Sequence, residues 1–258
     1  MTTPLTAGNT RVKEARKLSR RSVRTERRLF LADGPKAVEG ALGVPGCVVE
    51  VFATPAAAEE YDALLAAAPV TLVDDRALGS LSDSVNPAGL VAVCRFLEAA
   101  LPQRPGLLTI CADVRDPGNA GTVIRTTDAA GGDGVVLAGD AVDAYNPKTV
   151  RATVGSLFHL PVTTERDPAE AVRAARAAGL TVLAADGGGE VDLFAADELL
   201  AGPTAWLLGN EAWGLPAELA ALADHRVRIP ILGRAESLNL ATAASVCLFA
   251  SARARMRA

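Results

Sequence analysis

The sequence is poor in the residues that build metal centres and disulfide frameworks. It has two histidines and four cysteines in 258 residues, and the cysteines stand far apart with no CxxC pair. Neither histidine has a cysteine or a second histidine close to it. This spacing excludes the common zinc motifs. We therefore predict no metal site and four reduced, mostly buried cysteines.

Long apolar runs and aromatic residues are also scarce. No run approaches the roughly 18 apolar residues of a membrane span, and residues 1–28 are polar and basic without the apolar core of a signal peptide. We therefore expect no membrane partner and a cytoplasmic location. Half of the residues are hydrophobic but only 4% are aromatic. This balance favours a soluble α/β protein over a β-sandwich or a barrel.

Several nucleotide and hydrolase motifs are missing. The chain has no GxGxxG after a predicted strand, no GxxxxGK[ST] and no GxSxG. These absences argue against a Rossmann dinucleotide site, a phosphate-binding P-loop and the nucleophile elbow of an α/β-hydrolase. Without paired histidines, the sequence also offers no obvious histidine general base.

The charges present are unevenly distributed. The formal net charge is −4, but residues 1–36 carry ten basic and three acidic side chains, so this segment is +7 and the rest is −11. A basic arm on an acidic body is typical of a protein that contacts nucleic-acid phosphates. The alternative is a solvated helix that only keeps the protein soluble. The candidate RNA-binding residues of this arm are Arg16, Arg20, Arg21 and Arg24.

Strands and helices alternate along the whole chain, which predicts two α/β units. Residues 1–96 form the first unit, residues 97–105 (LEAALPQRP) form a linker, and residues 106–258 form the second unit. A basic helix is expected over residues 10–20 and a long final helix over 238–255. Strands are predicted at 29–32, 47–53, 70–73 and 89–96, and then at 107–112, 134–137, 160–163, 181–185, 205–208 and 226–231.

Three predicted strand ends in the second unit carry unusual polar residues, where open α/β sheets bind ligands. The first is DVRDPGNAGTVIR at residues 113–125. Asn119 is expected to cap the helix that begins there. Arg125 follows six residues later. Because a helix start favours anions, an arginine there suggests a role in holding a phosphate or ribose oxygen. The alternative is a surface arginine paired with an acid.

The second strand end is LLGNEAWGLP at residues 207–216. Gly209 permits close backbone approach to a ligand, and Glu211 can accept hydrogen bonds from hydroxyls or orient an arginine. Trp213 is either a stacking surface or a core residue. The alternative for the whole stretch is a glycine-rich loop with a hydrated glutamate.

The third strand end is RIPILGRAESLNLATAAS at residues 228–245. Ser237 is expected to be an ordinary N-cap of the final helix. Asn239 is less ordinary, because asparagine is unfavourable inside a helix. It therefore makes either a specific hydrogen bond or a second local cap.

Together and in this order, the three stretches resemble the motifs of the SpoU/TrmH RNA 2′-O-methyltransferases. The first resembles N-x-G-x-x-x-R, the second G-N/x-E-x-x-G-L and the third I-P…S-L-N. The stretch YNPKTVRATVGSLF at residues 145–158 is also similar to the family, with Arg151 in the matching place as a further RNA-binding candidate. The matching residues are Asn119, Gly121 and Arg125, then Gly209, Asn210, Glu211, Gly214 and Leu215, and then Ile229, Pro230, Ser237, Leu238 and Asn239.

The resemblance implies a fold and a chemistry. The second unit is expected to be a SPOUT-type α/β domain with a deep trefoil knot that binds S-adenosylmethionine, and the protein is expected to be a homodimer. The first unit is similar to small L30e-like RNA-binding domains. The expected cofactor-binding residues are Gly209, Asn210, Ile229 and Leu238. The expected catalytic residues are Arg125, Asn119, Glu211, Ser237 and Asn239, with Arg125 engaging the ribose oxygen.

The resemblance leaves alternatives for the substrate. An L30e-like first unit favours 23S ribosomal RNA, with transfer RNA second. A catalytically inactive RNA-binding paralogue is a further possibility, although the intact set of Arg125, Glu211 and Asn239 argues against it. A small-molecule enzyme on a generic α/β sheet is the remaining alternative.

Overall fold

The computed structural model describes residues 3–257. The contacts between residues divide this part of the chain into two compact units. The first unit contains residues 3–98 and 143–159, and the second contains residues 99–142 and 160–257. The segment 143–159 therefore groups with the first unit, although the sequence placed it in the second. Each unit has its own sheet. In the described residues no helix is long and apolar enough to cross a membrane.

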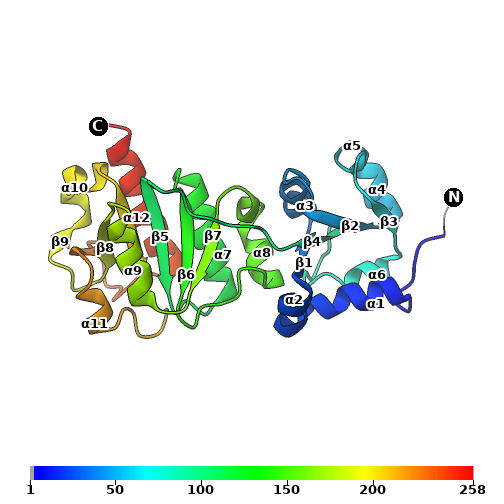
Figure 1. Cartoon of the computed structure of the whole chain (residues 1–258), viewed down its shortest axis with the longest axis horizontal. Coiled ribbons are helices and arrows are strands. Elements are labelled where there is room, and N and C mark those ends of the chain that lie inside the picture. The colour runs from blue at the N-terminus through cyan, green and yellow to red at the C-terminus, as the bar shows by residue number, and fades with distance from the viewer. Residues whose placement is uncertain (1–2, 258) are drawn as a thin grey trace. The chain divides into compact units, whose positions relative to one another are not determined.

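The first unit is built on a four-stranded sheet in the order β1-β4-β2-β3 (Figure 1). Its strands are β1 (Leu29–Asp33), β2 (Val48–Ala53), β3 (Val70–Leu72) and β4 (Leu90–Arg95). Strand β4 runs antiparallel to β1 and β2, whereas β3 is parallel to β2. Its helices are α1 (Thr10–Arg16), α2 (Arg21–Arg27), α3 (Pro35–Leu42), α4 (Pro55–Glu60), α5 (Asp62–Leu65), α6 (Asp75–Gly79) and α8 (Pro147–Thr153), with short 3₁₀ turns η1 (Lys17–Ser19) and η2 (Ser156–Phe158).

The basic helix predicted over residues 10–20 consists of α1 and the 3₁₀ turn η1, and a further helix, α2, follows after Arg20. Arg20 has an extended backbone, with φ −92° and ψ 129°, and separates η1 from α2. At this break the Arg24 guanidinium donates from Nη1 to the carbonyl oxygens of Leu18 and Ser19, at 2.9 and 2.8 Å. These bonds satisfy carbonyl groups that a helix end otherwise leaves unpaired.

Arg24 also anchors the segment 143–159 to the first unit. Its Nε and Nη2 atoms donate to Asp143 Oδ2 at 3.0 and 2.6 Å. Tyr145 then stacks on Phe96, with ring centroids 4.0 Å apart, and packs against Phe30. Only 1% of Arg24 is exposed. The prediction of Arg24 as an RNA contact is therefore wrong, because its guanidinium is buried and engaged within the protein.

The second unit is built on a seven-stranded parallel sheet in the order β7-β6-β5-β10-β8-β11-β9. Its strands are β5 (Leu107–Ala112), β6 (Gly134–Ala138), β7 (Val162–Glu165), β8 (Thr181–Ala185), β9 (Val191–Asp192), β10 (Thr204–Leu208) and β11 (His225–Arg228). Its helices are α7 (Pro117–Ala129), α9 (Pro168–Ala177), α10 (Asp197–Ala201), α11 (Ala217–Ala220) and α12 (Leu240–Arg255), with the 3₁₀ turn η3 (Leu193–Ala195).

Helices cover both faces of this sheet, as a buried parallel sheet requires (Figure 1). Helix α9 packs on one face through a core cluster that includes Ile110 and Val172. On the other face α12 packs against α7 and α10, and Ser251 Oγ accepts a hydrogen bond of 2.9 Å from Trp206 Nε1. All four cysteines are free and buried, as predicted.

The predicted strands of the second unit are present, with three differences. Strand β7 covers residues 162–165 instead of 160–163. The last one ends at Arg228 instead of residue 231, so the rest of the third polar stretch is free to form a loop. Strand β9 has only two residues and was missed, because so short a segment carries no periodic pattern. All seven strands are parallel, so their carboxyl ends lie along one edge of the sheet.

Candidate functional site

The loop after β10 is held in a tight hairpin at the carboxyl edge of the sheet. Asn210 and Gly214 exchange two backbone hydrogen bonds, of 3.0 and 2.9 Å. A Cβ atom on Gly209 would lie 2.4 Å from the carbonyl carbon of Gly214, so this position requires glycine. The Asn210 side chain accepts from Ala212 N and donates to the Asp113 carbonyl oxygen, at 2.8 and 2.6 Å. The loop is therefore tied both to itself and to the end of β5.

A chain of side-chain hydrogen bonds joins all three predicted motifs. Asn119 Nδ2 donates to Glu211 Oε1 at 3.2 Å, and Asn239 Nδ2 donates to Asn119 Oδ1 at 3.1 Å. Asn119 and Glu211 are 92 residues apart, and Asn119 and Asn239 are 120 apart. The three polar strand ends therefore meet in one place.

The start of α7 places Glu211 beside backbone donors. The Glu211 carboxylate accepts from Arg115 N at 3.4 Å and from Asp116 N at 3.2 Å, where a helix start favours an anion. Burial raises the pKa of the nearby Cys111 thiol to about 12, and the Glu211 charge adds to this rise. The cap of α7 is Asp116, which accepts from Asn119 N at 2.7 Å. The prediction of Asn119 as the cap is wrong, and its side chain serves the Glu211 bond instead.

The final helix begins at Leu240, two residues later than predicted. Asn239 is its cap, with Oδ1 accepting from Ala241 N at 2.9 Å and Thr242 N at 3.3 Å. The prediction of Ser237 as the cap is therefore wrong, and Ser237 lies in the preceding loop. Both interpretations of Asn239 hold at once, because its oxygen caps the helix while its amide nitrogen reaches Asn119.

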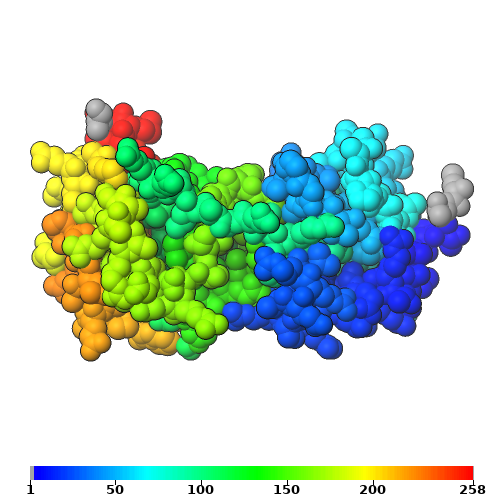
Figure 2. Space-filling view, viewed as in Figure 1, coloured from blue at the N-terminus to red at the C-terminus, as the bar shows by residue number. Residues whose placement is uncertain are grey.

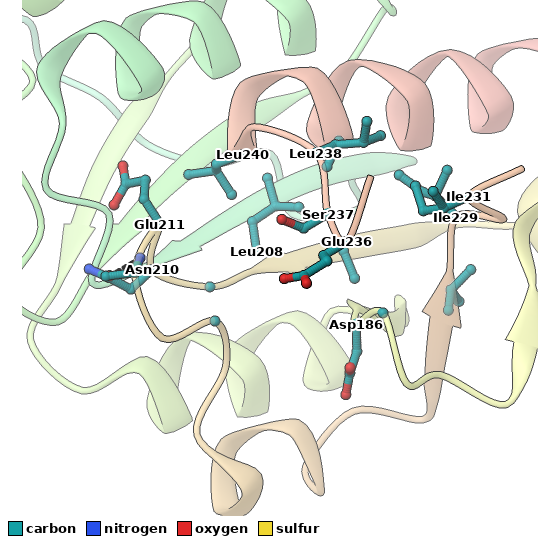
Figure 3. A pocket seen from close by; sticks show the side chains of 17 residues that line it. Asp186, Leu208, Asn210, Glu211, Ile229, Ile231, Glu236, Ser237, Leu238 and Leu240 are labelled. Carbon is teal, nitrogen blue, oxygen red and sulfur yellow. Dashed lines mark hydrogen bonds between the residues drawn. The ribbon is translucent and has the colours of Figure 1, made fainter. Parts of the chain in front are cut away.

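A cavity of about 340 Å³ opens beside this chain of bonds (Figure 3). Its wall combines apolar side chains with three carboxylates, those of Asp186, Glu211 and Glu236, which are labelled in Figure 3. Of the predicted site residues, the cavity is lined by Gly209, Asn210, Glu211, Ile229, Ser237 and Leu238. Others that line it include Ala185, Asp186, Leu208, Ile231, Glu236, Leu240 and Ala243.

Sequence reasoning missed two of the three acidic residues of the cavity wall, Asp186 and Glu236. Asp186 directly follows β8 and precedes three glycines, so the same strand-end rule could have found it. Glu236 stands next to Ser237 in a loop and carries no periodic signal. Both carboxylates give the cavity a negative wall, which suits a positively charged ligand.

Arg125 lies on an exposed face of α7 and does not line the cavity. Six residues separate it from Asn119, which is about 9 Å along a helix axis. Arg151 belongs to the first unit, where Nη1 lies 3.7 Å from Asp33 and Nη2 lies 3.5 Å from Asp83. The structure therefore brings neither arginine into the pocket of its own chain.

The other predicted RNA contacts lie at the surface. Arg16, Arg20 and Arg21 are exposed, and none of them forms an ion pair with another residue in the described part of the chain. Helices α1 and α2 form a continuous part of the surface of the first unit (Figure 2). The charges of Arg16, Arg20 and Arg21 are therefore available to an external anion, unlike that of Arg24.

Family models match most of the chain. The model of the SpoU rRNA Methylase family matches residues 106–249, which include the entire site described above. The chain belongs to the SpoU rRNA methylase family. A model of the MRM3-like substrate binding domain matches residues 9–92.

Relatives of the SpoU family are similar over nearly the full chain. The 23S rRNA (guanosine(2553)-2′-O)-methyltransferase RlmP of Bacillus subtilis is 36% identical over 245 residues, or 94% of this chain and 96% of RlmP. An AdoMet-bound rRNA methyltransferase from Sinorhizobium meliloti has a TM-score of 0.83 at 35% identity, covering 97% of both chains. The AdoMet complex of the SpoU methyltransferase AviRb from Streptomyces viridochromogenes has a TM-score of 0.85 at 32% identity, covering 97% of this chain and 100% of AviRb.

Proposed function

We propose that this protein transfers a methyl group from S-adenosylmethionine to a ribose 2′-hydroxyl of RNA, and that its substrate is 23S ribosomal RNA. The observation that carries this proposal is the hydrogen-bond chain from Glu211 through Asn119 to Asn239 at the rim of the cavity. The SpoU relatives with this fold are named as rRNA methyltransferases. The same observations favour this proposal over the two alternatives that the sequence left open, a small-molecule enzyme and an inactive paralogue.

The cavity fits the methyl donor. Its volume of about 340 Å³ lies in the range of small-molecule sites. Leu208, Ile229 and Leu240 offer an apolar wall for the adenine ring, whereas Asp186 and Glu236 offer carboxylates for ribose hydroxyls and the ammonium group. Backbone groups of Gly209, Asn210, Ile229 and Leu238 are the proposed contacts to the donor. When bound, the donor supplies an electrophilic methyl group on a sulfonium.

The residues at the rim position the acceptor. Asn119, Glu211 and Asn239 form a fixed polar edge, and Ser237 adds a hydroxyl inside the cavity. Alignment of the ribose oxygen with the methyl carbon supplies much of the rate, because it converts an encounter into a reaction within one complex. An arginine remains protonated at neutral pH, so Arg125 stabilises the developing alkoxide or holds a phosphate.

The position of Arg125 supports a homodimer. Because Arg125 does not line the pocket of its own chain, we propose that a second copy brings its Arg125 to the site. We also propose that the second unit contains the deep trefoil knot that the resemblance implies.

The first domain holds the RNA. We assign residues 1–96 to an L30e-like substrate-binding domain, residues 97–105 to a linker and residues 106–258 to the catalytic domain, whose segment 143–159 contacts the first unit. The exposed Arg16, Arg20 and Arg21 are its phosphate contacts. Because ribosomal RNA is the proposed substrate, we propose a cytoplasmic location for the protein.

The test measures transfer of a radiolabelled methyl group from S-adenosylmethionine to an unmodified 23S rRNA transcript, followed by digestion to nucleosides. A labelled 2′-O-methyl nucleoside is the expected product. A tRNA transcript is assayed in parallel, and preferential labelling of tRNA would overturn the proposed substrate. Donor binding is measured separately by calorimetry. A protein that binds RNA but neither binds the donor nor transfers the label is the inactive paralogue.

A further inference from the structure

The two tryptophans of the chain have opposite environments. Trp206 is fully buried in β10, with its indole N–H bonded to Ser251. Trp213 is 54% exposed, although a tryptophan side chain gains more from burial than almost any other. It stands in the hairpin between Asn210 and Gly214, two residues after Glu211. An exposed indole at the rim of a reaction site needs an explanation beyond folding.

The indole is held in place by an arginine. The guanidinium carbon of Arg115 lies 5.2 Å from the centroid of the Trp213 ring, which is a cation–π contact. Arg115 Nη2 forms an ion pair of 2.8 Å with Asp140, and Arg115 N donates to Glu211. Arg115 is therefore held at both its backbone and its guanidinium, and it contacts the exposed indole, which restrains the ring before a flat partner binds.

This pair lies next to the residues that position the acceptor. Arg115 immediately precedes the cap of α7, and the Glu211 carboxylate joins the backbone of Arg115 to the side chain of Asn119. A nucleotide whose ribose reaches Asn119 and Glu211 therefore has its base, or that of its neighbour, within reach of Trp213. Single-stranded RNA is recognised by stacking such bases on aromatic rings and guanidinium planes.

We propose that Trp213 and Arg115 form a stacking platform for an unpaired base of the substrate RNA, at or beside the methylated nucleotide. The inference rests on the proposed function and adds a residue that determines how the RNA is seated. Trp213 supplies a flat apolar surface, while Arg115 supplies a positive charge that favours the adjoining phosphate. The platform takes any base with an exposed face and excludes a base that stays paired in a helix.

The first test compares Trp213→Ala with Trp213→Phe in the transfer assay on the full-length protein. Loss of one base stack predicts a 5- to 150-fold rise (an order-of-magnitude range) in KM for the RNA. The phenylalanine variant is expected to recover most of the loss, and the Kd for S-adenosylmethionine is expected to stay unchanged in both. The matched control is Phe194→Ala in η3, which removes an aromatic side chain that is 57% exposed away from the cavity.

The second test uses tryptophan fluorescence, because the exposed Trp213 and the buried Trp206 are the two emitters. Addition of the RNA transcript is expected to quench the wild-type emission through stacking on Trp213. The Trp213→Phe variant, which retains Trp206, is expected to bind the same RNA without this quenching. Quenching that persists in Trp213→Phe would place the base elsewhere and overturn the proposal.

Three further outcomes separate the possible failures. If the wild type transfers methyl groups to RNA but Trp213→Ala has an unchanged KM, the platform is refuted and the proposed function stands. If Trp213→Ala changes the oligomeric mass in sedimentation, the indole is a protein–protein contact and the proposal is overturned. If the wild type labels no RNA at all, the proposed function itself fails.

Discussion

Replacing Arg24 by methionine is expected to destabilise the first unit strongly, although Arg24 stands among arginines that face solvent. The guanidinium makes two contacts to Asp143 Oδ2, at 3.0 and 2.6 Å, and two to the carbonyl oxygens of Leu18 and Ser19. The side chain of Asp143 is only 15% exposed, so Arg24→Met leaves a largely buried carboxylate without its cation. Breaking one side of such a pair costs about 3–5 kcal/mol.

The assay is chemical denaturation, which gives the free energy of unfolding of each variant. The matched control is Arg20→Met, because Arg20 is exposed at the break before α2. We expect this control to change the free energy of unfolding by less than about 0.5 kcal/mol. It is also expected to weaken RNA binding and to reduce the slope of log affinity against log salt concentration by about 1, which corresponds to one phosphate contact. The double variant Arg24→Met/Asp143→Leu is expected to recover part of the lost stability, since it removes the unpaired charge.

The result that refutes this reasoning is a loss below about 1 kcal/mol in Arg24→Met, the smallest effect expected of an ordinary buried hydrogen bond. A loss of RNA affinity in Arg24→Met, with stability unchanged, would restore Arg24 as a phosphate contact. It would also show that the segment 143–159 is held on the first unit mainly by other contacts, such as the stacking of Tyr145 on Phe96.

The remaining predictions concern the second unit. Gly209→Ala is expected to abolish donor binding in calorimetry, because its Cβ would lie 2.4 Å from the Gly214 backbone. The control is Gly79→Ala, whose Cβ meets nothing within 4 Å. Equal donor affinities of the two variants would contradict the argument. Arg125→Ala is expected to abolish methyl transfer while leaving donor affinity intact, and a fully active variant would disprove its role. Burial raises the pKa of Cys111 and Cys247 to about 12, so both thiols are expected to resist alkylation at pH 8 unless the protein is unfolded. The raised thiol pKa values stabilise the folded state as long as the thiols are protonated, and this stabilisation is lost as the pH rises from about 9 to 12. The double variant Cys111→Ala/Cys247→Ala is expected to reduce the decrease in the free energy of unfolding over this pH range.

Local chemistry was enough to find the elements that carry the site. Alternating strands and helices, with polar residues after the strands, predicted an α/β sheet whose ends hold Asn119, Glu211 and Asn239. The sequence did not determine which polar side chain of a turn caps the helix that follows. Two nearby polar residues can each cap a helix, and Asp116 and Asn239 displaced Asn119 and Ser237 through backbone geometry that the sequence does not contain.

Tertiary structure decided which of these residues meet and which are buried. Strand β10 lies between β5 and β8, so residues 92 positions apart share a hydrogen bond, and no local pattern records such pairing. Arg24 and Arg20 are alike in sequence, yet only Arg24 lies beneath a segment that returns from residue 143. Trp206 and Trp213 differ in the same way, because burial depends on what the rest of the chain places over a side chain.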